Sequence, residues 1–203
     1  MLSYLLTAFS GPAGVFMYAL LVVMAFAIAV VIERAVVLWR TRCDPAPLLA
    51  RLEAAIAAGS AATLSFGDTP MEQVAQAGAR YTDPDLAWES MTAASISAEQ
   101  RVRRRVGYLS TVASVSTMIG LFGTVYGLIL AFGALGDVAA AQRAAALSEG
   151  SSTAMASTAF GLLVAIPALA AHAYLDATAR DRLADIERVA TRLILALKAK
   201  ARA

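Results

Sequence analysis

Two threonines, Thr124 and Thr158, stand in otherwise apolar parts of this sequence. Each lies in an uncharged run long enough to cross a bilayer, which takes roughly 20 apolar residues. Polar side chains inside a membrane are costly unless they face a bundle interior or a water-filled path. The sequence therefore predicts that helices present these two hydroxyls to a narrow polar interior.

Small residues surround both threonines. Gly120, Gly123 and Gly127 interrupt the first of these two runs, and the Gly123-xxx-Gly127 spacing lets another helix approach closely. Two interpretations fit such faces: they pack helices together, or they line a pore. The sequence also places Pro167 inside the second run, where proline is expected to bend the helix.

Depth in the membrane favours the pore. If the two runs form antiparallel helices, Thr124 and Thr158 lie at a similar level, and a symmetric oligomer repeats them as a ring. Three spans cannot enclose a pore alone, so an oligomer is required. The residues expected to line the path are Thr124, Thr158, Ser114, Thr117, Ser151, Ala154, Gly161 and Ala165. The residues expected to pack helices are Gly120, Gly123, Gly127 and Pro167.

Asp, Glu, Lys and Arg are missing from the cores of the predicted spans, although a proton path usually needs a titratable relay. Either another protein supplies a carboxylate, or the channel does not carry protons. His172 lies near the end of the last span, and a solvated interfacial side chain is favoured over a titrating one. Glu149 precedes that span, and a helix cap is favoured over a proton carrier.

Composition places the chain in a membrane. Of its 203 residues, 59% are hydrophobic and 16% are charged, against about 25% charged in soluble domains. We expect an all-α protein with three transmembrane helices, two of them extended far into the cytoplasm. The expected segments are a periplasmic or interfacial helix (1–14), a first span (15–39), a cytoplasmic insertion (40–83), a long helix (84–135) with a second span from about 107, a periplasmic loop (136–149), a third span (150–175) and a C-terminal helix (176–203).

Basic residues fix the expected orientation. Sixteen of the 17 lysines and arginines lie between the first two spans or after the third, and only Arg143 lies between the second and third. The positive-inside rule then places the N-terminus outside and the C-terminus in the cytoplasm. No basic residue precedes Arg34, so the chain lacks the basic start of a cleavable signal peptide, and the first span is expected to be retained.

Charges mark the predicted inner interface. Glu33 and Arg34 end the first span, where an anchor is favoured over a salt bridge to another subunit. The cluster before the second span consists of Arg101, Arg103, Arg104 and Arg105. Such a cluster suits lipid headgroups or nucleic acid, and contact with lipid is favoured.

Cap signals predict helices in the cytoplasmic part. Asp44-Pro45 begins a helix that should stop at Gly59, a second helical piece covers about 71–81, and Asp83-Pro84 begins the long helix. Cys43 is the only cysteine and His172 the only histidine, which excludes an internal disulfide and a cysteine-based metal cluster. We expect no metal, no cofactor and no enzymatic activity.

Two segments resemble the signatures of a known family. Gly120-Leu-Phe-Gly-Thr-Val-Tyr-Gly127, followed by Phe132, and Ser157-Thr-Ala-Phe-Gly-Leu-Leu-Val-Ala-Ile-Pro167 are similar to those of the MotA/TolQ/ExbB proton-channel family. The Glu33-Arg34 pair and the three-span layout fit the same family. Length and span number resemble its ExbB and TolQ subunits more than MotA, which has four spans.

The resemblance implies a homopentamer in the bacterial inner membrane around an ExbD- or TolR-like partner with one span, whose aspartate supplies the missing carboxylate. Thr124 and Thr158 take the places of pore-facing threonines beside that aspartate. Such complexes convert proton motive force into work through TonB or TolA. TonB-dependent transport is favoured, and a Tol–Pal or gliding-type motor and a non-conducting structural oligomer remain alternatives. Where some ExbB proteins have a glutamate five residues before the second threonine, this chain has Thr153.

Overall fold

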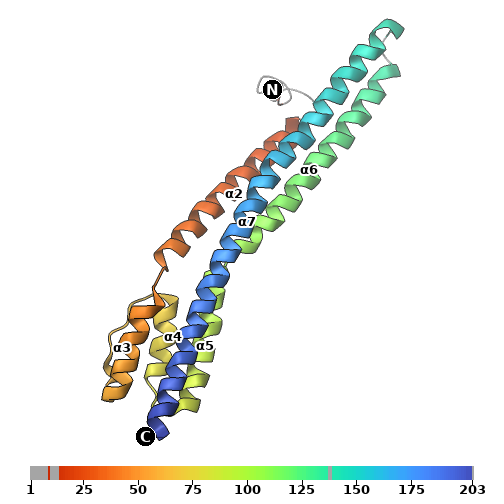
Figure 1. Ribbon diagram of the computed structural model, residues 1–203. Coiled ribbons are helices and arrows are strands. Elements are labelled where there is room, and N and C mark those ends of the chain that lie inside the picture. Colours follow the sequence, from red (N-terminus) through yellow and green to blue (C-terminus); the bar gives the residue numbers. More distant parts are fainter. Residues whose placement is uncertain (1–8, 10–13, 137–138, 203) are drawn as a thin grey trace. The chain divides into compact units, whose positions relative to one another are not determined.

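A computed structural model describes residue 9 and residues 14–136 and 139–202 of the chain. The helix expected at 1–14 therefore lies almost wholly outside the described residues. In chain order the helices are α2 (Gly14–Arg40), α3 (Pro45–Ala58), α4 (Pro70–Ala79), α5 (Pro84–Arg103), α6 (Val106–Gly133) and α7 (Arg143–Arg202), with short 3-10 turns at Ala61–Thr63, Ala134–Gly136 and Ala140–Gln142. Figure 1 shows them.

The described part of the chain is helical, and three of its helical stretches are long and apolar enough to cross a membrane. They lie within Gly14–Ala58, Pro84–Gly136 and Arg143–Arg202. The expectation of an all-α protein with three membrane-spanning helices is confirmed to this extent.

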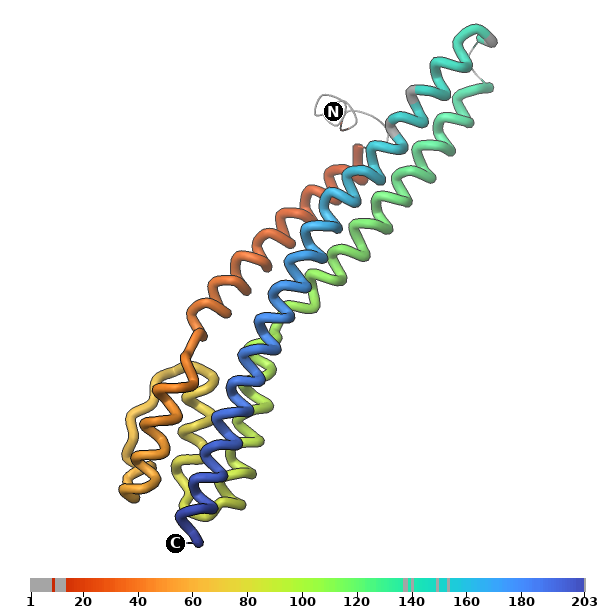
Figure 2. The backbone as a smooth tube through the Cα atoms, in the orientation of Figure 1, coloured from red at the N-terminus to blue at the C-terminus, as the bar shows by residue number. Residues whose placement is uncertain are grey.

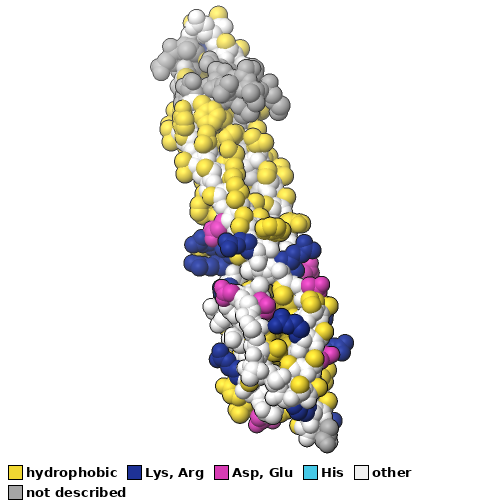
Figure 3. All heavy atoms as spheres, turned by 90° about the vertical axis from the view of Figure 1, so that its left-hand side faces the viewer, with side chains coloured by type: hydrophobic (Ala, Val, Ile, Leu, Met, Phe, Trp, Pro, Cys, Tyr) yellow, Lys and Arg dark blue, Asp and Glu magenta, His cyan; other side chains and the backbone are white. Residues whose placement is uncertain are grey.

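The chain divides into two compact units, and both α2 and α7 run through the division. The first, here called the membrane unit, comprises Met1–Glu33 and Arg105–Ala173. The second, the bundle unit, comprises Arg34–Arg104 and Tyr174–Ala203. On the face drawn in Figure 3, yellow hydrophobic side chains predominate on the membrane unit, and charged side chains are scattered among hydrophobic ones on the bundle unit.

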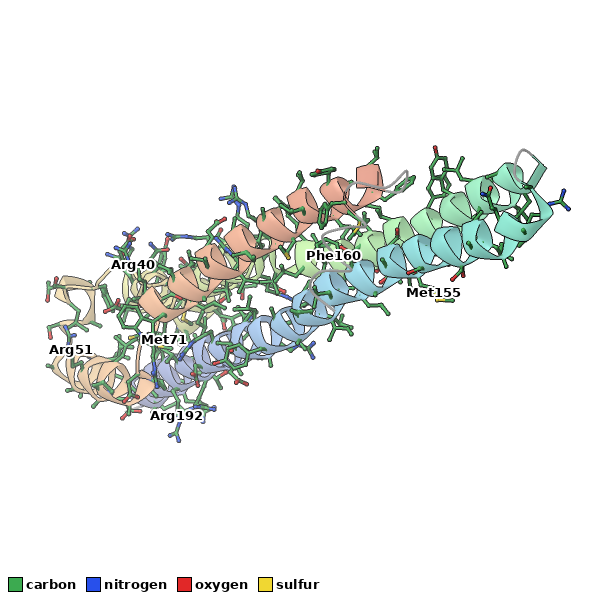
Figure 4. The ribbon with its side chains drawn as sticks, turned by 90° about the horizontal axis from the view of Figure 1, so that it is seen from above. Arg40, Arg51, Met71, Met155, Phe160 and Arg192 are labelled. Atoms are coloured by element: carbon green, nitrogen blue, oxygen red, sulfur yellow. The ribbon has the colours of Figure 1, made fainter. Side chains whose placement is uncertain are left out.

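The membrane unit packs α2 against α6 and α7 through aromatic and aliphatic side chains. The ring of Phe16 in α2 meets those of Phe122 and Tyr126 in α6 edge-on. Met17 and Leu20 of α2 form a buried cluster with Phe160 of α7. Met155 of α7, unlike the buried Phe160, points away from the neighbouring helices (Figure 4).

The bundle unit is built from α3, α4, α5 and the C-terminal part of α7, as the tube in Figure 2 traces. Its first helix has the caps that the sequence predicts. The Asp44 carboxylate accepts the Ala46 amide at 3.0 Å, and Gly59 ends the helix at φ 76°, a left-handed conformation that suits glycine. Among the described residues of this unit, sixteen buried side chains form the core: eleven are Leu, Ile, Val or Met, and five are Ala.

The long helix expected over 84–135 is interrupted. It begins at Pro84 as predicted, but α5 ends at Arg103 and α6 starts at Val106. Between them Arg105 takes φ 62°, the one positive φ of a non-glycine residue in the described ranges. A left-handed residue with a side chain costs roughly 1–2 kcal/mol, so tertiary contacts must hold it there.

The loop expected over 136–149 is shorter than predicted. Helix α7 already begins at Arg143 and continues to Arg202, so the third span and the C-terminal helix are one element. Glu149 therefore lies inside α7, and its interpretation as a helix cap is wrong.

Candidate functional site

Helices α6 and α7 touch along a seam of small residues. On α6 these are Gly120, Gly123 and Gly127, and on α7 they are Ala154, Ser157 and Gly161. A Cβ atom added at Gly120 would lie 3.0 Å from the Ser157 carbonyl oxygen, and one added at Gly127 would lie 3.0 Å from the Ala154 Cβ. The backbones approach so closely that a larger side chain has no room there.

The spacing of these residues explains the seam. On each helix they recur every three or four positions, which keeps them on one face. Lipid tails are as apolar as leucine, so helices in a membrane gain little from burying large aliphatic groups against each other. Small residues instead permit close backbone contact.

The seam brings Thr124 and Thr158 together, and their hydroxyl oxygens are in direct contact. The Thr124 hydroxyl also lies 3.2 Å from the carbonyl oxygens of both Gly120 and Ala154. The Thr158 hydroxyl lies 3.1 Å from the Gly120 carbonyl oxygen. Both side chains are half-buried.

This arrangement defines what the pair can do. Each hydroxyl has one proton to donate and two lone pairs, so either threonine can donate to the other while its partner donates to a carbonyl. Exchanging the two arrangements reverses the direction of the hydrogen bond without moving a backbone atom. The hydrogen bond between the two threonines can therefore point in either direction, but the pair cannot hold a charge by itself.

The other residues predicted to line a path fall into two groups. Ser114 and Thr117 are exposed, and their hydroxyls donate to carbonyls of their own helix at 3.1 and 3.0 Å. Ser151 is half-buried. Ala154, Gly161 and Ala165 are instead buried within the single chain, so their predicted pore-lining role is corrected to helix packing.

Pro167 lies inside α7 with its side chain exposed in the single chain, so its expected role in packing helices stays a prediction. Gly120, Gly123 and Gly127, by contrast, are buried where a packing role places them.

His172 is half-buried, and its Nδ1 lies 3.1 Å from the Val106 carbonyl oxygen. This ring nitrogen meets the first turn of α6, and the interpretation of His172 as a solvated interfacial side chain stays a prediction. The contact joins α7 to the start of α6.

The charges expected at the inner interface form pairs within each unit. In the membrane unit, Arg105 donates to both oxygens of Glu33, at 2.6 and 2.7 Å. In the bundle unit, the buried Arg34 donates to the carbonyls of Arg101 at 3.4 Å and Arg104 at 3.0 Å. Arg34 thus satisfies carbonyls at the end of α5, which an interrupted helix leaves without partners.

Another residue of the arginine cluster, Arg103, is paired with a carboxylate in α7. Arg103 lies 3.5 Å from Asp176, to which the Nε of Arg180 also donates at 2.9 Å. The arginines at 103 and 105 therefore have protein partners in addition to any lipid contact.

The described residues contain no group of three His, Cys, Asp or Glu side chains placed to hold a metal ion. Burial raises the pKa of the Cys43 thiol, and the nearby Glu72 carboxylate raises it further. The thiol is therefore a weak nucleophile at neutral pH.

Sequence reasoning missed two seam residues, Ser116 and Ser157. Both are fully buried. A signal was present, because each lies four positions before a seam glycine, Gly120 and Gly161 respectively, and so shares its face.

Comparison with known proteins identifies the family. Residues 67–188 match the MotA/TolQ/ExbB proton channel family. Over 118 residues the chain is 34% identical to the Tol-Pal system protein TolQ of Pseudomonas aeruginosa, a match that covers 52% of this chain and 51% of the relative. Over 73 residues it is 45% identical to TolQ of Haemophilus influenzae, covering 36% of this chain and 32% of the relative.

A third relative is named ExbB and not TolQ. The biopolymer transport protein ExbB of Aquifex aeolicus is 33% identical over 91 residues, covering 45% of this chain and 61% of the relative. In all three comparisons the match spans less than two thirds of the relative. The family match covers more than half of this chain, and it includes α6 and the seam residues of α7. The chain therefore belongs to the MotA/TolQ/ExbB proton channel family.

Proposed function

We propose that this chain is the ExbB/TolQ-like subunit of a proton-driven motor in the bacterial inner membrane, with its N-terminus outside and its C-terminus in the cytoplasm. It is not proposed to be an enzyme. The contact between the Thr124 and Thr158 hydroxyls, held between two apolar helices, carries this proposal. A pair of neutral hydroxyls can relay a proton along its hydrogen bond, but it needs a titratable group beside it to accept and release that proton.

That group is proposed to come from an ExbD/TolR-like partner with one span and a membrane aspartate, around which copies of this chain assemble as a pentamer. The described spans support a borrowed carboxylate, since the seam and its surroundings on α6 consist of apolar residues, glycine and hydroxyls. Transport of protons would then drive work through TonB. A TolQ-like role in a Tol–Pal system or a gliding-type motor is the alternative, because relatives named TolQ and ExbB both match.

A non-conducting structural oligomer is a second candidate, and one observation favours it. Ala154, Gly161 and Ala165 are buried inside the single chain, so part of the small-residue pattern is explained by packing without any ion path. Conduction must therefore be measured directly.

The test is proton flux into liposomes loaded with a pH-sensitive dye. The chain is reconstituted alone, with the one-span partner, and with the partner's membrane Asp→Asn variant. The proposal expects flux only when both proteins and the aspartate are present. Equal, background-level flux from all three preparations, with the complex verified as assembled, would instead favour the structural oligomer.

A further inference from the structure

Helix α5 presents an acidic and partly apolar face on the outside of the bundle unit. At 3.6 residues per turn, a set of exposed α5 residues falls within a sector of about 100°. They are Asp85, Trp88, Glu89, Thr92 and Ile96, here called the acidic face. Trp88 is 50% exposed and Ile96 58%, so the face offers apolar area beside its two carboxylates.

Helix α7 presents a face of the opposite charge. The exposed residues that share a similar sector, here called the basic face, are Arg188, Thr191, Arg192, Leu195, Ala199 and Arg202. Leu195 is 58% exposed and lies among the three arginines. Among the described residues, no ion pair joins Asp85 or Glu89 to an arginine of this face. The opposite charges of the two faces therefore do not meet within one copy.

The two faces lie at the same level of the bundle unit. A Cβ atom added at Gly78 would contact both Met91 of α5 and Leu193 of α7, so these two side chains are level with each other. The two helices are antiparallel, because Arg103 at the end of α5 meets Asp176, which precedes Leu193 in α7.

Matched heights bring like with like and acid with base. At 1.5 Å per residue from the level of Met91 and Leu193, Trp88 and Leu195 differ in height by about 1.5 Å. Glu89 and Arg192 differ by about 4.5 Å, as do Asp85 and Arg202. An apolar side chain on one face thus has an apolar counterpart on the other, and each carboxylate has an arginine.

A second copy of the chain suits this pair of faces. Rotation about an axis along the helices moves a copy sideways without changing its height, so the matched levels are kept. A heterologous contact of this kind repeats from copy to copy and forms a ring when the rotation closes. We propose that the acidic face of α5 in one copy binds the basic face of α7 in the next. The inference rests on the proposed function only in that both need an assembly of copies.

The charges favour a copy of the chain over other occupants. Lipid headgroups or nucleic acid would be attracted by the basic face, but Asp85 and Glu89 would repel them. Trp88 also suits an arginine of the neighbouring copy, because the face of its ring attracts cations.

The experiment is cross-linking between two differently tagged copies that are expressed together in membranes. Both carry Cys43→Ser, one carries Thr92→Cys and the other Thr191→Cys, so a disulfide that joins the two tags forms only between copies. The two positions differ in height by about 1.5 Å. Ala93→Cys replaces Thr92→Cys in the matched control, because Ala93 is also exposed but is turned by about 100° on α5.

We expect the Thr92–Thr191 pair to cross-link several-fold more than the Ala93–Thr191 pair. Glu89→Arg in both copies should reduce the first cross-link several-fold, because two like charges then face each other. Adding Arg192→Glu should restore the cross-link, since the swap re-creates opposite charges. A bundle unit that had merely unfolded would not recover in this way.

Equal cross-linking of the two pairs would overturn the proposal. So would the absence of the Thr92–Thr191 cross-link in copies that co-purify through both tags, the absence of co-purification, or a cross-link that Arg192→Glu does not restore. These readouts do not depend on proton flux. A cross-linked assembly that conducts no protons would contradict the proposed function and leave this contact standing.

Discussion

Each of the two units of this chain is stabilised internally, and the two do so by opposite means. In the bundle unit, large aliphatic side chains such as Leu193, Val189 and Met91 fill the core. In the membrane unit, the α6–α7 seam is formed where side chains are missing, at Gly120, Gly123 and their neighbours.

The difference follows from the solvent. In water, each buried leucine or isoleucine stabilises the fold by about 1.5–3 kcal/mol because its surface leaves water. In lipid that gain is absent, and close backbone packing takes its place. A volume added to the seam and a volume removed from the bundle core should therefore each destabilise the unit in which they lie.

Gly161→Leu should have the largest effect. Even a Cβ at this position would lie 2.8 Å from the Ser116 carbonyl oxygen, so a leucine forces α6 and α7 apart. We expect loss of the disulfide that forms between cysteines placed at Thr124 and Thr158 in a Cys43→Ser background. Gly133→Leu is the matched control, since a Cβ there meets nothing within 4 Å. Full cross-linking in Gly161→Leu would contradict the seam.

Leu193→Ala tests the other side of the comparison. Its side chain is 1% exposed, and removal of a buried leucine costs about 2–5 kcal/mol. Limited proteolysis should cut the bundle unit much faster, while the Thr124–Thr158 cross-link persists. Leu195→Ala, on the same helix but 58% exposed, should change little. Equal sensitivity of the two variants would show that the bundle core does not depend on Leu193.

Arg34→Leu should have an intermediate effect. The substitution leaves the carbonyls of Arg101 and Arg104 without their donor, at a cost of roughly 1–3 kcal/mol. Hydrogen exchange should accelerate at the C-terminal end of α5. The exposed Arg40→Leu serves as the control, and unchanged exchange in Arg34→Leu would show that this cap contributes nothing.

The Glu33–Arg105 pair should matter least. Both side chains are about 40% exposed, and ion pairs of this kind contribute roughly 0.2–1 kcal/mol. A double-mutant cycle of Glu33→Gln and Arg105→Gln, followed by thermal unfolding, measures the coupling. We expect a small value that falls with added salt. A coupling above about 2 kcal/mol would mean that the pair itself holds Arg105 in its left-handed conformation.

Features that depend on neighbours in the sequence were predicted well. Asp44-Pro45 and Gly59 bound α3 as expected, and Asp83-Pro84 begins α5, because caps are local interactions. The facing of Thr124 and Thr158 was also predictable, since it needs only two antiparallel helices and a similar depth.

Features that depend on tertiary contacts were not. Nothing in the local sequence marks the interruption before Val106. Two residues of α2 contact it: Glu33 accepts from Arg105, and Arg34 donates to the Arg104 carbonyl. At Ser148-Glu149 a good cap signal was overridden, because the preceding alanines and leucine continue the helix back to Arg143. A face of small residues also looks the same in sequence whether it meets another helix or a pore, which is why Ala154 and Gly161 were assigned to the wrong role.

We propose that the hydroxyls of the threonine pair, and not merely its packing, carry conduction. The direct measurement is proton flux through the assembled complex with Thr158→Val and Thr158→Ser. Valine keeps the shape but removes the hydroxyl, and serine keeps the hydroxyl. We expect flux to be lost in Thr158→Val and largely retained in Thr158→Ser, with assembly unchanged in both. Wild-type flux in an assembled Thr158→Val complex would contradict it.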